Sequence, residues 1–205
     1  MITWALIPVK RFNLGKSRLH EVLSPAELEA VNRHLFKKTL ATVKDSGVFN
    51  RVMVISEDPE VLLWVSDQGC YALPEEHTGD LNSALMQALD AIVRQGGGSV
   101  LMIPTDLPLL SASDLRILEG LVPEKNGLLI VPDHQMTGTN ALFVTEPKLM
   151  PTAFGANSFA LHLALAEERG LRQVIHLSSN IQRDLDTPED LAFFGDSLYQ
   201  KPIIN

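Results

Sequence analysis

Residues 3–19 read TWALIPVKRFNLGKSRL, an apolar run followed at once by a basic loop. The apolar part, residues 4–7, has the composition of a buried β-strand. Open α/β sheets hold anionic ligands at loops that leave the carboxyl ends of their strands. This stretch therefore predicts an α/β fold with an anion site after its first strand. The loop places four cations in a chain whose formal net charge is −8: Lys10, Arg11, Lys16 and Arg18.

Short apolar runs alternate with helical patterns along the rest of the chain. The predicted strands are residues 3–9, 51–56, 70–73, 99–103, 127–131, 141–144 and 174–176. The predicted helices are residues 25–44, 59–69, 80–94, 111–121, 158–168 and 188–194. This alternation predicts a three-layer, mostly parallel sheet, with residues 1–205 forming a single domain. The polar turn residues 132–139 precede a strand without a long helix between them, which indicates a small antiparallel element.

Three helix starts carry recognisable capping residues. Ser24 and Glu27 form a capping box around Pro25, and Ser111 with Asp114 is a variant of the same box. Thr187 is a candidate N-cap for the last helix. No helix is expected directly after Ser17.

Composition excludes several classes of protein. The negative net charge argues against a nucleic-acid partner or a membrane surface, which both select basic faces. The single Cys70 excludes an internal disulfide and a site of several thiolates, and we expect it to lie unreactive in a strand. No apolar run reaches 18 residues, and the N-terminus does not resemble a signal peptide, so a cytoplasmic protein is expected. The six histidines, His77 among them, show no metal-ligand spacing. A homodimer that uses residues 201–205 is left open.

The end of the basic loop, Gly15-Lys16-Ser17, resembles a phosphate-binding P-loop. The full pattern requires a glycine at position 10, where Lys10 stands, so the glycine nest of a P-loop is not expected. Two interpretations remain. The loop is either a solvated basic segment or a segment that wraps a nucleoside triphosphate with Lys and Arg side chains.

A second motif places one carboxylate between two prolines. Residues 103–110 read IPTDLPLL, so Asp106 follows directly on an apolar strand. The prolines stiffen the loop and fix the direction of the carboxylate. A rigid Asp at a strand end suits a Mg²⁺ ligand beside phosphates. The alternative is that Asp106 caps the following turn, but Ser111 and Asp114 already supply capping groups, which favours the ligand.

A third motif pairs two carboxylates near the C-terminus. Residues 183–191 read RDLDTPEDL, in which Asp184 and Asp186 alternate with Leu185. In an extended segment both carboxylates point to one side, where they repel each other unless a cation lies between them. These residues are therefore candidate metal ligands.

Small residues and hydroxyls gather in two further segments. Residues 137–142 read TGTNAL and residues 154–159 read FGANSF. Free backbone N–H groups in such segments, the second at a helix start, can cradle a phosphate or a carboxylate; the alternative is two ordinary turns. Asn82 is either a helix cap or a residue that contacts a nucleotide. His162 is a candidate to face the same pocket from its helix.

These motifs together resemble the 2-phospho-L-lactate guanylyltransferase family of coenzyme F-420 biosynthesis, which includes phosphoenolpyruvate-specific enzymes. The resemblance spans nearly the whole chain and keeps the motif order. It implies a Rossmann-related, glycosyltransferase-A-like nucleotidyltransferase fold, similar to that of the molybdenum-cofactor guanylyltransferases. It also implies that GTP and a small phosphorylated carboxylic acid react to a guanylyl-diphospho acid and pyrophosphate. Gly15 stands where the family pattern has Ala, an exchange that keeps all the cations.

The resemblance also implies roles for individual residues. Lys16 and Asp106 would be catalytic, and GTP would be bound by Lys10, Lys16, Arg18 and Asn82. Mg²⁺ would be held by Asp106, Asp184 and Asp186. The phosphate and the carboxylate of the acceptor would be bound by Thr139, Gly155 and Ser158.

Other functions stay open on the residues alone. They are another nucleotidyltransferase, such as a molybdenum-cofactor guanylyltransferase, a sugar-nucleotide glycosyltransferase, or a non-catalytic nucleotide sensor. A glycosyltransferase would usually carry Asp-x-Asp where this chain has Asp106-Leu107-Pro108. A sensor would not need three Asp residues around a metal. The choice of guanine and of the acceptor acid follows from the resemblance only.

Overall fold

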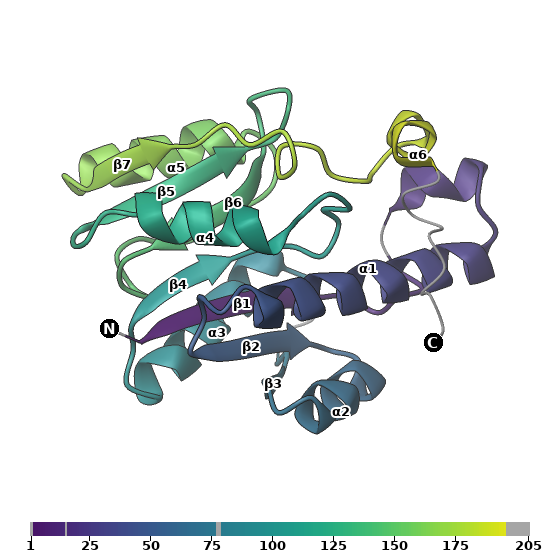
Figure 1. Cartoon of the computed structure of the whole chain (residues 1–205), viewed down its shortest axis with the longest axis horizontal. Helices are drawn as coiled ribbons and strands as arrows, with labels where there is room; N and C mark the ends of the chain where they lie inside the picture. The colour runs from purple at the N-terminus through teal and green to yellow at the C-terminus, as the bar shows by residue number, and fades with distance from the viewer. Residues whose placement is uncertain (1, 15, 77–78, 196–205) are drawn as a thin grey trace.

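The computed structural model describes residues 2–14, 16–76 and 79–195 (Figure 1). Gly15, His77 and residues 201–205, which figured in the expectations above, lie outside these ranges. In chain order the elements are β1 Thr3–Val9, η1 Ser17–Glu21, α1 Pro25–Asp45, β2 Arg51–Ser56, α2 Pro59–Asp67, β3 Tyr71–Pro74, α3 Leu81–Arg94, β4 Ser99–Met102, α4 Ala112–Leu121, β5 Gly127–Pro132, β6 Thr139–Val144, α5 Ser158–Glu168, β7 Arg172–Ile175 and α6 Pro188–Phe194.

The strands form one seven-stranded sheet in the order β3-β2-β1-β4-β6-β5-β7. Every neighbouring pair is parallel except the two pairs made by β6, which runs antiparallel to β4 and to β5. A parallel neighbour would need a long crossover, whereas residues 133–138 form only a short turn between β5 and β6. The mostly parallel α/β fold with a small antiparallel element is therefore confirmed.

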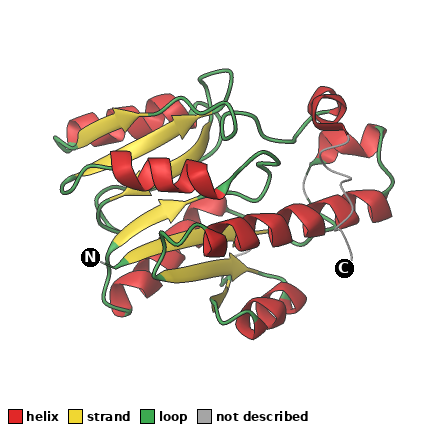
Figure 2. Ribbon diagram, viewed as in Figure 1, coloured by secondary structure: helices red, strands yellow, loops and turns green. Residues whose placement is uncertain are grey.

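Helices cover both faces of the sheet, as Figure 2 shows. Helices α1, α2 and α4 pack in one core with Ala5 and Ile7 of β1. Helices α3 and α5 pack in a second core with Trp4 and Leu6, the alternate residues of the same strand. Burial on both faces explains why these strands read as continuous apolar runs.

A third, smaller apolar cluster lies beyond the sheet at one end of α1. It joins Leu19 of η1, the first half of α1, Leu185 and Phe194 of α6. The expectation of no helix after Ser17 was wrong, because the five-residue 3-10 helix η1 begins there and carries Leu19 into this cluster, where it is fully buried. The basic loop and the Asp184–Asp186 segment are thereby held next to each other.

Capping residues begin the helices as the sequence indicates. The boxes of Ser24 with Glu27 and Ser111 with Asp114 are both formed, and Thr187 forms a further box with Asp190. Cys70, in contrast, precedes β3, because its N–H still bonds to the carbonyl of Val65 at the end of α2.

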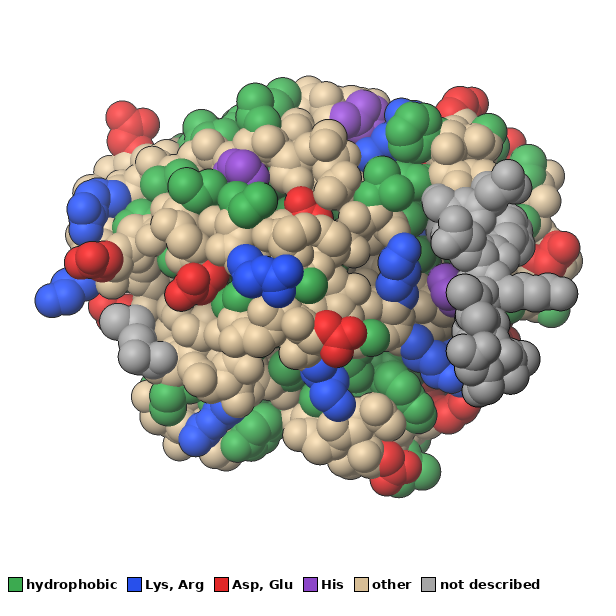
Figure 3. Space-filling view, in the orientation of Figure 1, with side chains coloured by type: hydrophobic (Ala, Val, Ile, Leu, Met, Phe, Trp, Pro, Cys, Tyr) green, Lys and Arg blue, Asp and Glu red, His purple; other side chains and the backbone are tan. Residues whose placement is uncertain are grey.

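Burial raises the pKa of the Cys70 thiol. Among the described residues, no helix combines the length and the apolar character needed to cross a membrane. On the face drawn in Figure 3, basic and acidic side chains are interspersed.

Candidate active site

The candidate site is a central cleft of about 590 Å³ at the carboxyl ends of β1 and β4. The sheet order changes direction between these two strands, since β2 follows on one side of β1 and β4 lies on the other. Ligands of open α/β sheets bind at such switch points. Predicted site residues that line the central cleft are Arg18, Asp106, Thr139, Gly155, Ser158, Asp184 and Asp186.

A second cavity of about 280 Å³, the basic-loop cavity, adjoins the central cleft. It is lined by Lys10, Arg11 and Lys16, and it shares Asp106 and Asp186 with the central cleft. The basic loop therefore lines a cavity, although the side chains of Lys10 and Arg11 are also exposed to solvent. One wall of the site is cationic, and the junction of the two cavities is acidic.

Lys16 is anchored at that junction. Its backbone adopts the left-handed conformation, with φ +50°, directly before η1. Its ammonium lies 3.3 Å from Oδ2 of Asp106 and donates to the carbonyl of Leu185. The carbonyl of Asp106 in turn accepts from the N–H of Leu185 at 2.9 Å. Among the described residues, the Asp106 side chain bonds to Lys16 and not to the turn that follows it, and Ser111 caps α4.

Side chains of the Asp184–Asp186 segment point alternately to the cleft and to the core, as the sequence predicts. Leu185 is fully buried in the third apolar cluster, while Asp184 and Asp186 both line the central cleft. Burial raises the pKa of Asp184, and the nearby charge of Asp106 raises it further, against the opposing effect of the Asn140 amide and of Lys16. Asp186 pairs instead with Arg18, with 3.3 Å between Nη1 and Oδ2.

The three predicted metal ligands do not converge on one point. Within the described ranges, no three His, Cys, Asp or Glu side chains are placed to hold one metal ion together. Asp186 is paired with Arg18, whereas Asp106 and Asp184 are close enough to interact electrostatically. Mg²⁺ commonly takes one or two carboxylates and completes its shell with phosphate oxygens and water. The pair Asp106 and Asp184 fits that donor set.

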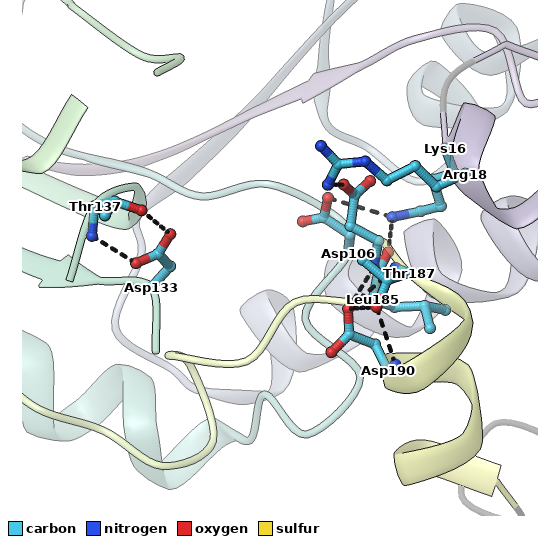
Figure 4. Close-up of polar contacts among 9 residues, drawn as sticks. Lys16, Arg18, Asp106, Asp133, Thr137, Leu185, Thr187 and Asp190 are labelled. Carbon is cyan, nitrogen blue, oxygen red and sulfur yellow. Dashed lines mark hydrogen bonds and ion pairs between the residues drawn. The ribbon is translucent and has the colours of Figure 1, made fainter. Parts of the chain in front are cut away.

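The loop between β5 and β6 forms the opposite wall, and Figure 4 shows it across the cleft from Lys16. The carboxylate of Asp133 accepts the N–H groups of Thr137 and Gly138, both at 2.8 Å, and the Thr137 hydroxyl at 3.1 Å. The expected cradle of free N–H groups in residues 137–142 is therefore wrong for these two amides, because Asp133 already occupies them. A Cβ on Gly138 would lie 2.7 Å from Oδ2 of Asp133.

The start of α5 keeps its amides free. Gly155 and Asn157 have φ angles of +123° and +57°, and Asn157 provides no side-chain cap. Within the part of the chain that the structure describes, the N–H groups of Gly155, Ala156 and Asn157 make no hydrogen bond. All three residues line the central cleft. Unpaired amides at a helix N-terminus attract anions, so this segment retains the expected cradle.

Asn82 does not cap α3, because Asp80 accepts the N–H groups of Asn82 and Ser83. Its side-chain amide instead accepts the N–H of Phe154 at 2.8 Å and donates to the Phe154 carbonyl at 2.9 Å. Asn82 therefore fastens α3 to the segment that leads into Gly155. A contact of Asn82 with a nucleotide stays a prediction.

Asp133 and Asn140 shape the site without having been predicted to take part individually, whereas His162 was predicted to face the pocket. Asp133 lies within residues 132–139, which the sequence indicated only as polar turn residues. The amide of Asn140, which is buried in β6, donates to the carbonyl of Ile181 at 2.8 Å and so holds the segment before Asp184. His162 does not face the pocket but is fully buried behind Thr139. Its partners are 9 and 23 residues away in sequence, so no local pattern could indicate them.

Solved structures share this fold at low sequence identity. A nucleotidyl transferase from Methanothermobacter superposes with a TM-score of 0.71 at 14% identity, over 97% of this chain and 98% of that chain. The 4-diphosphocytidyl-2C-methyl-D-erythritol synthase of Anaerococcus prevotii superposes with a TM-score of 0.64 at 13% identity, over 97% and 99% of the two chains. The chain therefore has the α/β fold of these nucleotidyltransferases.

Sequence comparison narrows the class to one family. Residues 3–196 match the family model described as guanylyl transferase CofC like. The phosphoenolpyruvate guanylyltransferase of Rubrobacter xylanophilus is 36% identical over 94% of this chain and 93% of its own length. The 2-phospho-L-lactate guanylyltransferase of Methanothermobacter thermautotrophicus is 37% identical over 94% and 83% of the two chains. The chain belongs to the CofC-like guanylyl transferase family, as its motifs indicated.

Proposed function

We propose that this enzyme transfers GMP from GTP to the phosphate of a small phosphorylated carboxylic acid and releases pyrophosphate. The acceptor is phosphoenolpyruvate or 2-phospho-L-lactate, and the reaction serves coenzyme F-420 biosynthesis. The observation that carries the proposal is the pair of adjoining cavities. One is lined by the basic loop and the other by free amides, and both share Asp106 and Asp186.

The reaction needs no covalent enzyme intermediate. A phosphate oxygen of the acceptor attacks the α-phosphorus of GTP in line, and the bond from that phosphorus to the β-phosphate bridging oxygen breaks. Pyrophosphate takes the electron pair. The attacking phosphate oxygen is already ionised at neutral pH, so no strong general base is required. The difficulty is to bring two polyanions together, which positioned cations and hydrogen-bond donors overcome.

The triphosphate belongs in the basic-loop cavity. Lys10, Lys16 and Arg11 line it, and Lys16 already spans from that cavity to Asp106 at the junction. The Lys16 side chain is only 11% exposed, so water screens the charge of its ammonium weakly. Arg18 reaches the site from η1 and would exchange its partner Asp186 for a phosphate.

The acceptor belongs on the opposite wall. Thr139 and Ser158 line the central cleft together with the free amides of residues 155–157. Hydroxyls and amides provide donors without adding a mobile charge, which suits a ligand that carries both a phosphate and a carboxylate. The phosphate of the acceptor would bind some of these donors, and its carboxylate would bind the others.

Mg²⁺ is the metal we propose for this site, held by Asp106 and Asp184 and, once Arg18 turns to a phosphate, by Asp186. When bound, it would screen the triphosphate and stabilise the charge that develops on pyrophosphate. A cytoplasmic location and a homodimer stay predictions.

A pyrophosphate-release assay tests the proposal. Phosphoenolpyruvate, 2-phospho-L-lactate and 3-phosphoglycerate are each supplied with GTP and with ATP. We expect release that depends on one of the first two acids and on GTP. No pyrophosphate release from GTP, together with GDP release from a GDP-sugar, would indicate a glycosyltransferase, and binding of GTP without any turnover would indicate a sensor. Either result would overturn the proposal.

A further inference from the structure

His162 lies directly behind the acceptor wall and is fully buried. It follows Ser158 by one helical turn on α5. Its Nδ1 lies 3.0 Å from the hydroxyl of Thr139, and its Nε2 lies 3.0 Å from the backbone nitrogen of Ala153. The ring of Phe154 packs edge-on against it, with 4.9 Å between ring centroids. One imidazole nitrogen is therefore paired with Thr139 of the predicted acceptor site, and the other with the backbone of Ala153.

The Ala153 contact determines the direction of the Thr139 contact. A backbone N–H can only donate, so Nε2 of His162 must accept and carries no proton. A neutral imidazole then holds its proton on Nδ1 and donates it to the Thr139 oxygen. Burial lowers the pKa of His162 to about 4, which keeps the ring neutral at physiological pH.

Because His162 donates in this hydrogen bond, the Thr139 hydroxyl can donate its own proton to another acceptor. Among the described residues, the hydroxyl makes no hydrogen bond other than that with His162. Thr139 lines the central cleft opposite the acidic junction. Because its oxygen accepts from His162, the hydroxyl presents itself to the cleft as a donor, as an anionic ligand requires.

We propose that His162 is a positioning residue for the acceptor, which fixes the Thr139 hydroxyl as a hydrogen-bond donor to a phosphate or carboxylate oxygen. This inference builds on the proposed function, because it assumes an anionic acceptor on this wall. His162 itself touches no substrate. It acts only by donating the proton on Nδ1 to the Thr139 oxygen.

Amide substitutions separate the two nitrogens of the ring. In His162→Gln the side-chain carbonyl can still accept from Ala153, but the donor to Thr139 is lost. In His162→Asn the shorter amide can still donate to Thr139, but the acceptor for Ala153 is lost. A hydrogen bond to a charged group is worth roughly a 10- to 100-fold change in binding. We expect His162→Gln to raise the KM for the acceptor by about that factor, with the KM for GTP unchanged, and His162→Asn to stay closer to the wild type.

A double-mutant cycle with Thr139→Val completes the test. Thr139→Val keeps the shape of the side chain and removes the hydroxyl, so adding His162→Gln should not raise the acceptor KM further. Additive effects, an equal loss in His162→Asn, or an unchanged acceptor KM in folded His162→Gln would each overturn the inference. Thermal unfolding of each variant identifies those that fail to fold.

A readout that needs no turnover keeps this test separate from the proposed function. Long-range ¹⁵N–¹H NMR of the wild-type protein at pH 7 should show His162 protonated on Nδ1 and bare on Nε2. The opposite tautomer, or a doubly protonated ring, would overturn the inference even if the enzyme is active. If no phosphorylated acid supports pyrophosphate release, the proposed function fails while the tautomer result still stands.

Discussion

The ammonium of Lys16 and the carboxylate of Asp106 meet at 3.3 Å, at the junction of the two cavities, although 90 residues separate them in sequence. Asp106 follows β4 and Lys16 precedes η1, so this contact joins the basic loop to the carboxyl end of the central strands. It places opposite charges where a nucleotide and an acceptor would meet. The first two predictions concern its two partners.

Asp106→Asn keeps the size of the side chain and removes its charge. We expect the variant to remain folded and to release pyrophosphate roughly 10²- to 10³-fold more slowly, the usual effect of losing one electrostatic contact in a transition state. Initial rates at saturating GTP and acceptor provide the measurement. Asp67→Asn, on the exposed surface of α2, removes the same charge elsewhere and should leave the rate unchanged. Near-normal turnover of Asp106→Asn would exclude Asp106 from the reaction.

Lys16→Met preserves much of the aliphatic stem and removes the ammonium. We expect the Kd for GTP to rise by roughly 10- to 100-fold, because a weakly exposed cation contributes about 1.5–3 kcal/mol to a charged hydrogen bond. Calorimetric titration with GTP measures this change. Lys125→Met is the matched control, since Lys125 is exposed and lies just before β5, at the opposite edge of the sheet. Unchanged GTP affinity in Lys16→Met would remove Lys16 from the triphosphate site.

His162 should make stability depend on pH. The folded state holds its pKa at about 4, whereas an unfolded histidine titrates near its ordinary value of 6.5. Below that value the unfolded chain binds a proton that the folded chain refuses, so stability falls as pH drops from 6.5 towards 4 and is unaffected above. The contribution lost is up to about 3 kcal/mol. Urea unfolding of wild type and His162→Gln across this range isolates it, and parallel curves would contradict the assignment.

Gly138→Ala tests the loop between β5 and β6. The added Cβ would lie 2.7 Å from Oδ2 of Asp133, which must then leave the amides it accepts from. We expect a loss of about 1–3 kcal/mol in stability, together with a higher KM for the acceptor. Gly120→Ala, in the last turn of α4 with no atom within 4 Å of the new Cβ, should instead stabilise by up to about 1 kcal/mol. Equal effects of the two substitutions would show that Asp133 adapts freely.

Local sequence patterns were sufficient for most of the fold. Residues 3–9, 51–56 and 158–168 form the expected elements, because apolar periodicity and capping residues act over short distances. The same reasoning could not foresee η1, which forms because Leu19 docks against residues far along the chain.

The site divides in a similar way. Residues named from their motifs, such as Asp106 and Ser158, do line the cleft. The partners that compete for these groups could not be predicted from the sequence. Asp133 accepts two amides of the loop that were expected to be free, and Arg18 pairs with Asp186. Whether a polar group is available depends on which other side chain reaches it first, and that is decided by tertiary packing.

Leu185 carries a consequence for the order in which the site is assembled during synthesis. Its N–H and carbonyl bond to Asp106 and to Lys16, while its side chain joins the cluster that contains α6. Domains tend to fold from the N-terminus as the ribosome extends them. A nascent chain that has already paired β1 with β4 still lacks the carbonyl that anchors Lys16. The contact that anchors Lys16 thus forms only after residues 185–194 have left the ribosome, and shorter nascent chains lack it.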